Sequence, residues 1–367
     1  MSGALIQLVS KGIQDMYLIS DEGQSFFRMK FTRHTNFSQS PKLIKTIYAE
    51  DETITIPILG DIINAVWVQG SNKLMDMFVN STIDLYIGGQ KVDSQHFDYY
   101  SDIWPNYLAD TYTKSKELNT KMSSVNSGFL PLQFFFCNHK AFLPLVALQS
   151  HQVEIKIKYD QTRFPELELT EDEKKIEVYG NYIFLDKEER ENIVKRQMDL
   201  VITQVQRLEH PLNTSDGYNS VDISHFNHPV KSLFFGFESK TDTYTTDFFT
   251  FSGLDIHLNG TSLLENMKPM YFHTIQNYYK SKFGTSEFDN TNNIPVYTRY
   301  YAYHFCMNAS QYHPSGSCNF SRLDNAKLMI RGASVAASRS GDPLHVYAVN
   351  YNVLRIKDGL AGILFGN

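Results

Sequence analysis

The chain is poor in cysteine, and this scarcity excludes two classes of small protein. Its 367 residues include three cysteines, Cys137, Cys306 and Cys318. Three cysteines make no disulfide framework, and no Cys-x-x-Cys pair indicates a metal site. We therefore expect Cys137 and Cys306 to be small buried side chains in a protein that works in a reducing compartment.

Long apolar runs and blocks of positive charge are also absent. No run reaches the roughly 18 apolar residues of a membrane span, and the N-terminus lacks the basic start and unbroken apolar core of a signal peptide. The net charge is −6, from 34 basic and 40 acidic residues. The densest basic run, residues 28–34, is short, so we expect no direct nucleic-acid binding.

Motifs for catalysis and cofactor binding are missing. The sequence has no Gly-x-Ser-x-Gly, no His-Glu-x-x-His and no phosphate-binding glycine loop. The close pair His225 and His228 precedes a proline and has no carboxylate or cysteine at ligand spacing. We expect His139, His151 and His304 to be hydrogen-bonded residues of strands or loops. The sequence thus predicts no catalytic, cofactor-binding or metal-binding residues and no enzyme.

The composition favours a folded protein rich in β-sheet. Hydrophobic residues make up 42% and charged residues 20%, while aromatics reach 14% with 26 Phe and 22 Tyr. Residues 153–159 alternate apolar and charged side chains, which predicts a strand with one buried face. Pro144, within the preceding apolar run 142–148, favours a strand end, a bulge or an edge.

One strongly amphipathic helix is predicted ahead of the β-rich part, at residues 2–19. Leu5, Val9, Gly12 and Met16 fall within one arc at 100° per residue, and polar side chains fill the other. The polar face is not rich in Lys or Arg, so docking on protein is favoured over an interfacial lipid helix.

The pattern of elements repeats once, roughly 170 residues later. Hairpins are predicted at 83–92 and 254–261, with Gly-Gly and Asn-Gly turns. Strand 153–159 corresponds to 326–331, and 181–185 corresponds to 350–354. Residues 134–137 correspond to 303–306, and helical stretches are predicted at 96–122, interrupted at Pro105, and at 267–283. The sequence therefore predicts two tandem β domains, as jelly rolls or Greek-key sandwiches.

Motifs along the whole chain resemble the double jelly-roll major capsid proteins of nucleocytoplasmic large DNA viruses, such as phycodnaviruses and iridoviruses. The matching segments are GIQDMYL at 12–18, RHTNF at 33–37, IGGQKVD at 87–93, LPLVALQSH at 143–151, NHPVK at 227–231, PSGSCNFSRLDNA at 314–326 and NYNVLRI at 350–356. The NHPVK match accounts for the histidine pair without a metal.

The resemblance implies an N-terminal amphipathic segment at 1–27 and two eight-stranded jelly rolls, at 28–195 and 196–367. It also implies a homotrimer with a pseudo-hexameric outline that tiles an icosahedral virion shell beside neighbouring capsomers. Minor capsid and penton proteins are the implied partners, and the N-terminal segment would face them and the inner viral membrane. Assembly would take place in the host cytoplasm.

Two features keep alternatives open. Family members are commonly longer, and the compact loops here also suit a minor capsid paralogue at special shell positions. The other alternative is a carbohydrate-binding protein of the virion surface, for which residues 277–279 (Asn-Tyr-Tyr) are the best candidate; their place in the repeat predicts that they pack inside instead. An enzyme of the cupin or glycosidase kind would share only the architecture.

Overall fold

The computed structural model describes residues 11–17, 27, 33–48, 50, 52–114, 128–138, 141–162, 164–214, 217–237, 248–281, 288–289, 294–295 and 300–366. The chain divides into two compact units, Met1–Asn36 and Phe37–Asn367. Of the helix predicted at 2–19, the described part contains the 3-10 helix η1 (Gln14–Tyr17), with Ile13 and Met16 exposed. The rest of that prediction lies outside the described residues.

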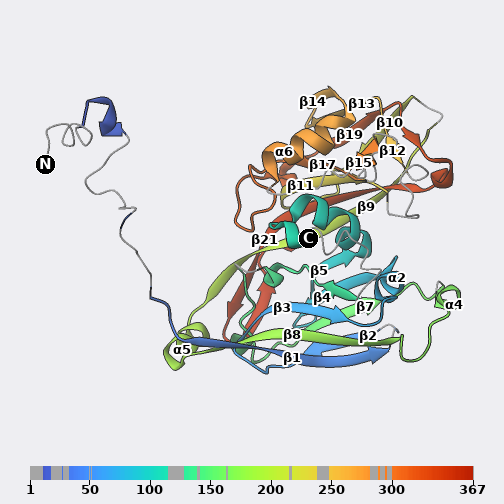
Figure 1. Ribbon diagram of the computed structural model, residues 1–367. Coiled ribbons are helices and arrows are strands. Elements are labelled where there is room, and N and C mark those ends of the chain that lie inside the picture. Colours follow the sequence, from blue (N-terminus) through green and yellow to red (C-terminus); the bar gives the residue numbers. More distant parts are fainter. Residues whose placement is uncertain are drawn as a thin grey trace, which may run out of the picture. The chain divides into compact units, whose positions relative to one another are not determined.

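The first half of the larger unit contains two four-stranded antiparallel sheets that face each other across a core (Figure 1). One sheet has the order β1-β8-β3-β6, formed by β1 (Phe37–Tyr48), β8 (Lys175–Leu185), β3 (Ile62–Gln69) and β6 (Phe129–Pro131). The other has the order β2-β7-β4-β5, formed by β2 (Glu52–Ile56), β7 (Val153–Lys158), β4 (Thr82–Ile87) and β5 (Gln90–His96). Because the chain crosses repeatedly between the sheets, the topology is a jelly roll.

The second half repeats this strand order. Its first sheet is six-stranded and contains the order β9-β21-β11-β17, formed by β9 (Met198–Pro211), β21 (Pro343–Lys357), β11 (Pro229–Gly236) and β17 (Tyr300–His304). Two short strands extend it, β18 (Cys318–Asn319) beside β11 and β22 (Leu360–Ile363) beside β21. Its second has the order β10-β19-β13-β14, formed by β10 (Tyr218–Asp222), β19 (Ala326–Arg331), β13 (Gly253–Leu258) and β14 (Thr261–Met267). The predicted all-β fold of two tandem jelly rolls is confirmed.

Short elements complete the fold. The helices are α2 (Leu74–Phe78), η2 (Tyr99–Leu108), η3 (Phe135–Cys137), η4 (Leu145–Ala147), α4 (Phe164–Leu167), α5 (Lys187–Lys195), η5 (Tyr271–Ile275), α6 (Gln276–Lys280), η6 (Phe320–Arg322) and η7 (Ala337–Arg339). The short strands are β12 (Phe249–Thr250), β15 (Phe288–Asp289), β16 (Ile294–Pro295), β18 (Cys318–Asn319), β20 (Ser334–Val335) and β22 (Leu360–Ile363).

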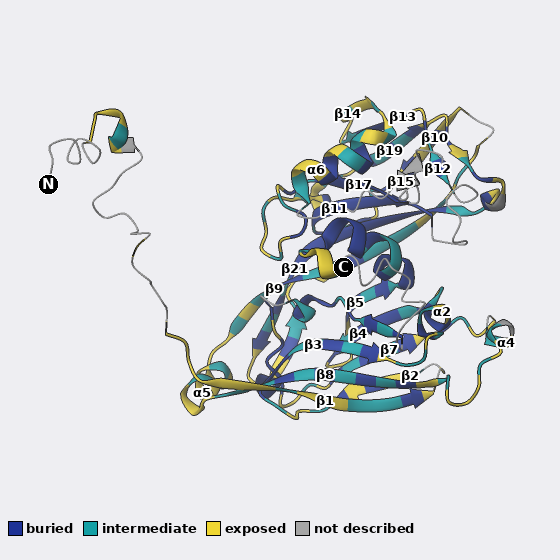
Figure 2. Ribbon diagram, viewed as in Figure 1, coloured by how far each residue is buried: buried dark blue, intermediate teal, exposed yellow. Residues whose placement is uncertain are grey.

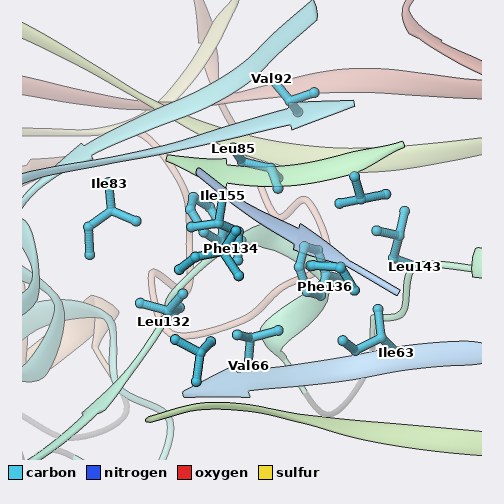
Figure 3. Close-up of a cluster of buried hydrophobic side chains, with 14 of the residues drawn as sticks. Ile63, Val66, Ile83, Leu85, Val92, Leu132, Phe134, Phe136, Leu143 and Ile155 are labelled. Carbon is cyan, nitrogen blue, oxygen red and sulfur yellow. The ribbon is translucent and has the colours of Figure 1, made fainter. Parts of the chain in front are cut away.

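The two strands with the clearest alternation occupy equivalent inner positions in the two rolls. In β7, Val153, Ile155 and Ile157 are buried while the charged residues between them are half-buried. Strand β19 has the same burial pattern along its length. Figure 3 shows Ile155 within the first core, among side chains from both sheets. Each such isoleucine contributes about 1.5–3 kcal/mol by burial, which fixes the register of the strand.

Both predicted hairpin turns are confirmed. Gly88 and Gly89 have φ of 58° and 79°, and Asn259 and Gly260 have φ of 49° and 79°. Two consecutive positive φ values define the type I′ turn that matches the twist of the flanking strands. The side chain of Asn259 accepts hydrogen bonds from the backbone N–H groups of Asp324 and Asn325, at 3.0 and 3.2 Å.

The two glycines of the first turn provide a matched test of local packing. A Cβ on Gly88 would lie 2.3 Å from Nδ1 of His151, whereas a Cβ on Gly89 meets nothing within 4 Å. Gly89→Ala should therefore lower the free energy of unfolding by about 1–2 kcal/mol, the penalty for placing an L side chain in the left-handed backbone region. Gly88→Ala should cost clearly more, since it displaces His151 from the N–H of Ala361, 3.1 Å away. Urea unfolding of both variants checks this, and equal losses would contradict it.

The helical stretches and the apolar segment after β6 differ in detail from the prediction. Pro105 lies inside the π-helix η2 and does not interrupt it, because a π turn already departs from the regular i→i−4 bonding that proline disrupts. Pro144 lies between an isolated bridge at Leu143 and η4, as expected for a strand end. Residues 134–137 contain the 3-10 helix η3, whereas in the corresponding segment 303–306 Tyr303 lies in strand β17. The two segments of the repeat therefore differ in secondary structure.

The long strands β9 and β21 join the two rolls. They pair along nearly their whole lengths, from Pro343↔Pro211 to Ile356↔Met198. One end of β21 places Leu344 and Val346 in the second core. Its other end places Leu354 and Ile356 in the first core. The rolls therefore share a continuous two-stranded ribbon (Figure 1), while the predicted divisions at residues 27 and 195 stay predictions.

Candidate functional site

The two rolls meet at a contact that combines a cluster of buried apolar side chains with buried hydrogen-bonded groups, and we call this contact the seam. Helix η2 of the first roll packs its apolar face against the second roll. Its buried contributors are Tyr99, Ile103, Tyr107 and Leu108, which meet Val205, Phe234, Tyr300, Ala302, Cys306, Ala309, Tyr347 and Val349. The hydroxyl of Tyr107 also donates to the carbonyl of Tyr300. The seam is thus packed as a third core.

Asp98, directly before η2, anchors the polar part of the seam. Its carboxylate accepts hydrogen bonds from the hydroxyls of Tyr300, at 2.6 Å, and Tyr347. Nδ1 of His345 lies 3.4 Å from the same carboxylate. Burial acts to raise the pKa of Asp98, but the hydrogen bonds from His345 and the two tyrosines outweigh it and lower the pKa to about 2. Asp98 is therefore ionised at neutral pH.

The second ring nitrogen of His345 extends this network to β9. Nη2 of Arg207 lies 3.1 Å from Nε2 of His345, and Arg207 also pairs with Glu209 at 2.7 Å. Since Arg207 can only donate, Nε2 accepts and Nδ1 carries the proton toward Asp98. One chain of charges and hydrogen bonds thus joins residues distant in sequence.

Amide side chains form a ladder along the middle of the ribbon. Asn350 and Asn352 of β21 are buried. Gln206 donates to the side-chain oxygen of Asn350 at 2.8 Å, and Asn352 donates to that of Gln204 at 2.9 Å. Gln204 in turn donates to the carbonyl of Val92 in the first roll. The two asparagines of the NYNVLRI segment therefore have a structural explanation: they lie in the middle of β21, between apolar ends of that strand that fill different cores.

A second buried carboxylate also crosses the seam. Asp93 of β5 accepts from the backbone N–H of Val205 at 2.8 Å and from Gln95 at 2.6 Å. Burial raises the pKa of Asp93 to about 7, although these hydrogen bonds act to lower it. Sequence reasoning missed Asp93, Asp98 and His345. A histidine inside the apolar run of β21 was the available signal.

The histidines named from the sequence lie in separate environments. His225 is exposed, whereas His228 is buried with a φ of 67° and its N–H donates to Ser321 at 2.7 Å. His304 lies 2.8 Å from Ser232 through Nδ1, and His139 lies outside the described residues. Within the described ranges, no three His, Cys, Asp or Glu side chains are placed to hold a metal ion. That no metal binds stays a prediction.

The prediction that the Tyr-rich segment packs inside is wrong for its two tyrosines. Tyr278 and Tyr279 are 79% and 75% exposed, with their rings in edge contact at 4.9 Å between centroids. The inward face of α6 carries Gln276 and Asn277 instead, and Gln276 accepts from the N–H of His304 at 3.2 Å. Figure 2 shows the exposed positions on α6. The inward face of this helix is thus attached through the amide of Gln276 and not through aromatic packing.

The described surface has two notable hollows. One, of about 350 Å³, lies at the end of β2 and β7, between Ile56, Leu145 and His151. The other, of about 60 Å³, opens at the seam beside Lys231. None of the helices among the described residues is both long and apolar enough to cross a membrane.

The cysteines are all free thiols. Cys306 is buried in the seam, as expected, while Cys137 and Cys318 are half-buried. Burial raises the pKa of the Cys137 thiol to about 12, so it is not a reactive thiolate at neutral pH.

Comparison with known protein families gives two adjoining matches. Residues 189–362 match the large eukaryotic DNA virus major capsid protein family, and residues 25–186 match the major capsid protein N-terminus.

Relatives match over their full lengths. The major capsid protein of Pyramimonas orientalis virus is 28% identical over 413 residues, and that of Paramecium bursaria Chlorella virus 1 is 26% identical over 453 residues. Both matches cover 100% of this chain and 100% of the relative. Because both alignments are longer than this chain, the relatives carry residues that have no counterpart here.

Solved structures share the fold. The PBCV-1 virus capsid gives a TM-score of 0.75 at 22% identity, covering 94% of this chain and 100% of that one. The Faustovirus major capsid protein gives 0.64 at 10% identity, covering 95% of each chain.

Proposed function

The chain belongs to the family of large eukaryotic DNA virus major capsid proteins, and from this premise we propose that three copies associate into one capsomer. As a structural protein of this family it forms the virion shell with other capsomers. The finer proposal is a homotrimer with a pseudo-hexameric outline, tiling an icosahedral shell. We propose that the protein has no enzymatic activity. We also propose that the shell assembles in the host cytoplasm.

The repeated strand order is the observation that carries this proposal. Two rolls with the same topology lie in one compact unit, Phe37–Asn367. Three such chains supply six similar rolls, and a near-sixfold outline packs a plane through closed, repeating contacts. The ribbon and the seam hold the two rolls of each chain at a fixed spacing, which such tiling requires.

Sedimentation equilibrium of the purified chain tests the proposed stoichiometry. The expected mass is three times the 42.3 kDa of one chain, with no dependence on concentration in the micromolar range. A monodisperse species of 42.3 kDa would overturn the trimer but not the fold.

The N-terminal segment is proposed to act between capsomers and not within them. It forms a unit of its own, Met1–Asn36, and its Ile13 and Met16 are 84% and 76% exposed. We propose minor capsid proteins, penton proteins and the inner viral membrane as its partners. Deleting residues 1–19 should leave the trimer mass unchanged but impair shell assembly in infected or co-expressing cells. Loss of trimers on deletion would show instead that the segment belongs to the capsomer.

Two observations keep alternative roles in view. The additional residues in the relatives suit the alternative of a minor capsid paralogue at special shell positions. The exposed pair Tyr278 and Tyr279 suits a carbohydrate-binding role at the virion surface, since aromatic rings stack on sugar faces. Glycan-array binding that is lost in the double variant Tyr278→Ala, Tyr279→Ala would support the second role, and absence of binding would reject it.

A further inference from the structure

The helices that follow the second sheets of the two rolls differ in how they are covered. Helix η2 follows the edge strand β5 of the first roll, and the helix pair η5–α6 follows the edge strand β14 of the second. Helix η2 buries Tyr99, Ile103 and Tyr107 against the second roll. The η5–α6 pair occupies the equivalent position in the second roll, so its surroundings can be compared directly with the seam.

The outward side of η5–α6 is apolar and exposed. Ile275, Tyr278 and Tyr279 are 36%, 79% and 75% exposed. Their spacing of i, i+3 and i+4 places them side by side on a helix, and we call these three residues the helix face. Phe272 and Gln276 are buried, so the opposite side holds the helices to their own roll. The helix face has the aromatic and aliphatic composition found at the centre of protein interfaces.

The seam shows which kind of surface such a helix covers. Helix η2 packs against Phe234 of β11, Tyr300 of β17 and Tyr347 of β21, each at most 1% exposed. Leu344 and Val346 alternate with Tyr347 along β21 and lie in the second core. Successive side chains of a strand point to opposite faces, so η2 covers the outer face of the sheet β9-β21-β11-β17.

The equivalent sheet of the first roll carries an apolar row on its outer face. Strand pairing places Leu43, Tyr179 and Trp67 next to one another across β1, β8 and β3, and we call them the outer row. The rings of Trp67 and Tyr179 stack with centroids 5.7 Å apart. Their neighbours Val66 and Val178 lie in the first core, so the two rings point outward. Leu43 is 46% exposed and both rings are half-buried, and Figure 2 shows exposed and half-buried residues along β1.

The helix face and the outer row belong to different rolls and lie far from each other in one chain. Figure 1 shows the sheet of β1 and β8 on the side of the first roll that faces away from α6 and the second roll. The two surfaces can therefore meet only between copies, in a head-to-tail contact that closes into a ring when the rotation fits. Ser281, directly after α6, donates to the carbonyl of Tyr107 in η2 at 3.0 Å. The η5–α6 pair is thus continuous with the seam.

We propose that the helix face of one copy docks on the outer row of a second copy. This contact repeats between copies the contact that η2 makes within each chain. The inference rests on the trimer proposed above, because three such contacts alternate with three seams and close a ring of six rolls.

Charge placed on either surface tests the contact. In the double variant Tyr278→Glu, Tyr279→Glu, and separately in Leu43→Glu, the sedimentation mass should fall toward that of one chain. The dissociation constant of the trimer should rise about 100-fold or more, since aromatic residues central to an interface contribute most of its affinity. Tyr218 is 49% exposed in β10, outside both surfaces, and Tyr218→Glu should leave the trimer unchanged.

The possible outcomes separate this contact from the stoichiometry. Trimers as stable in both surface variants as in the unaltered chain would overturn the contact and leave the trimer standing. Glycan binding lost in that same tyrosine variant would then assign the two tyrosines to carbohydrate. A monomeric unaltered chain would overturn the trimer and the contact together.

Cross-linking tests the contact without disrupting it. The double variant Leu43→Cys, Tyr279→Cys, treated with a short bifunctional maleimide, should form covalent trimers with three times the 42.3 kDa of one chain. Each single variant should give only the background that Cys137, Cys306 and Cys318 produce in the unaltered chain. A double variant that sediments as a trimer but yields no more cross-linked product than the single variants would overturn the proposal.

Discussion

Replacing Asp98 with alanine is expected to lower the free energy of unfolding by about 3–5 kcal/mol, because several buried donors lose their acceptor at a cost of about 1–3 kcal/mol each. The substitution leaves the Tyr300 and Tyr347 hydroxyls and the ring of His345 without their shared acceptor. Because Asp98 belongs to the first roll and its three partners to the second, the loss should appear mainly as weaker attachment between the rolls. Urea unfolding measures it.

Asp199 provides the matched control. Its carboxylate pairs with Arg355 through two contacts of 2.8 Å, and both side chains are about two-fifths exposed. Exposed pairs of this kind stabilise little, so Asp199→Ala should change unfolding far less than Asp98→Ala. Equal losses of unfolding free energy in the two variants would show that the buried carboxylate of the seam stabilises the fold no more than an exposed ion pair does.

The pH dependence of stability identifies the same carboxylate. The pKa of Asp98 falls from 3.8 to about 2 in the folded chain. A group with a lowered folded pKa contributes stability that is present above its unfolded pKa and is lost as the pH falls through the folded value. The unaltered chain should therefore lose more stability than Asp98→Ala between pH 4 and pH 2. Parallel pH profiles would contradict this assignment.

Replacing Leu354 with alanine is expected to lower the free energy of unfolding by about 2–5 kcal/mol, the range observed when a buried leucine is truncated to alanine. Leu354 is 0% exposed and lies in β21, a strand of the second roll, yet its side chain is part of the first core. Hydrogen exchange should therefore accelerate in β7 of the first roll. Val201→Ala provides the control on the same ribbon, since Val201 is 40% exposed.

The outcome of the Leu354 experiment distinguishes two arrangements. If the ribbon joins the cores, β7 and β19 should lose protection together, because one cooperative unit contains both. Faster exchange confined to β7 and its neighbours in the first roll, with β19 unchanged, would mean that the rolls unfold independently and that the shared ribbon contributes little.

Local pattern predicted much of the fold correctly, for identifiable reasons. The alternation along β7 and β19, and the glycines at positions 89 and 260, depend on side-chain period and backbone sterics, which act within a few residues. The repeat made the same elements visible twice. Two tandem β domains could therefore be predicted without knowledge of long-range contacts, whereas the choice of jelly rolls over Greek-key sandwiches rested on the family resemblance.

The seam could not be predicted in this way. Asp98 and His345 are separated by some 250 residues, and neither carries a local pattern that names the other. The exposure of Tyr278 and Tyr279 was also missed, because a repeat position predicts a backbone path but not which face of a short helix turns inward. There, the bonding of Gln276 to His304 decides the orientation.

Electron microscopy of the purified oligomer tests the central claim most directly. If three copies of this double jelly roll form a capsomer, class averages should show a threefold particle with a hexagonal outline and six lobes, two from each chain. Two-lobed particles of a single chain, or open chains of subunits without threefold symmetry, would contradict the account.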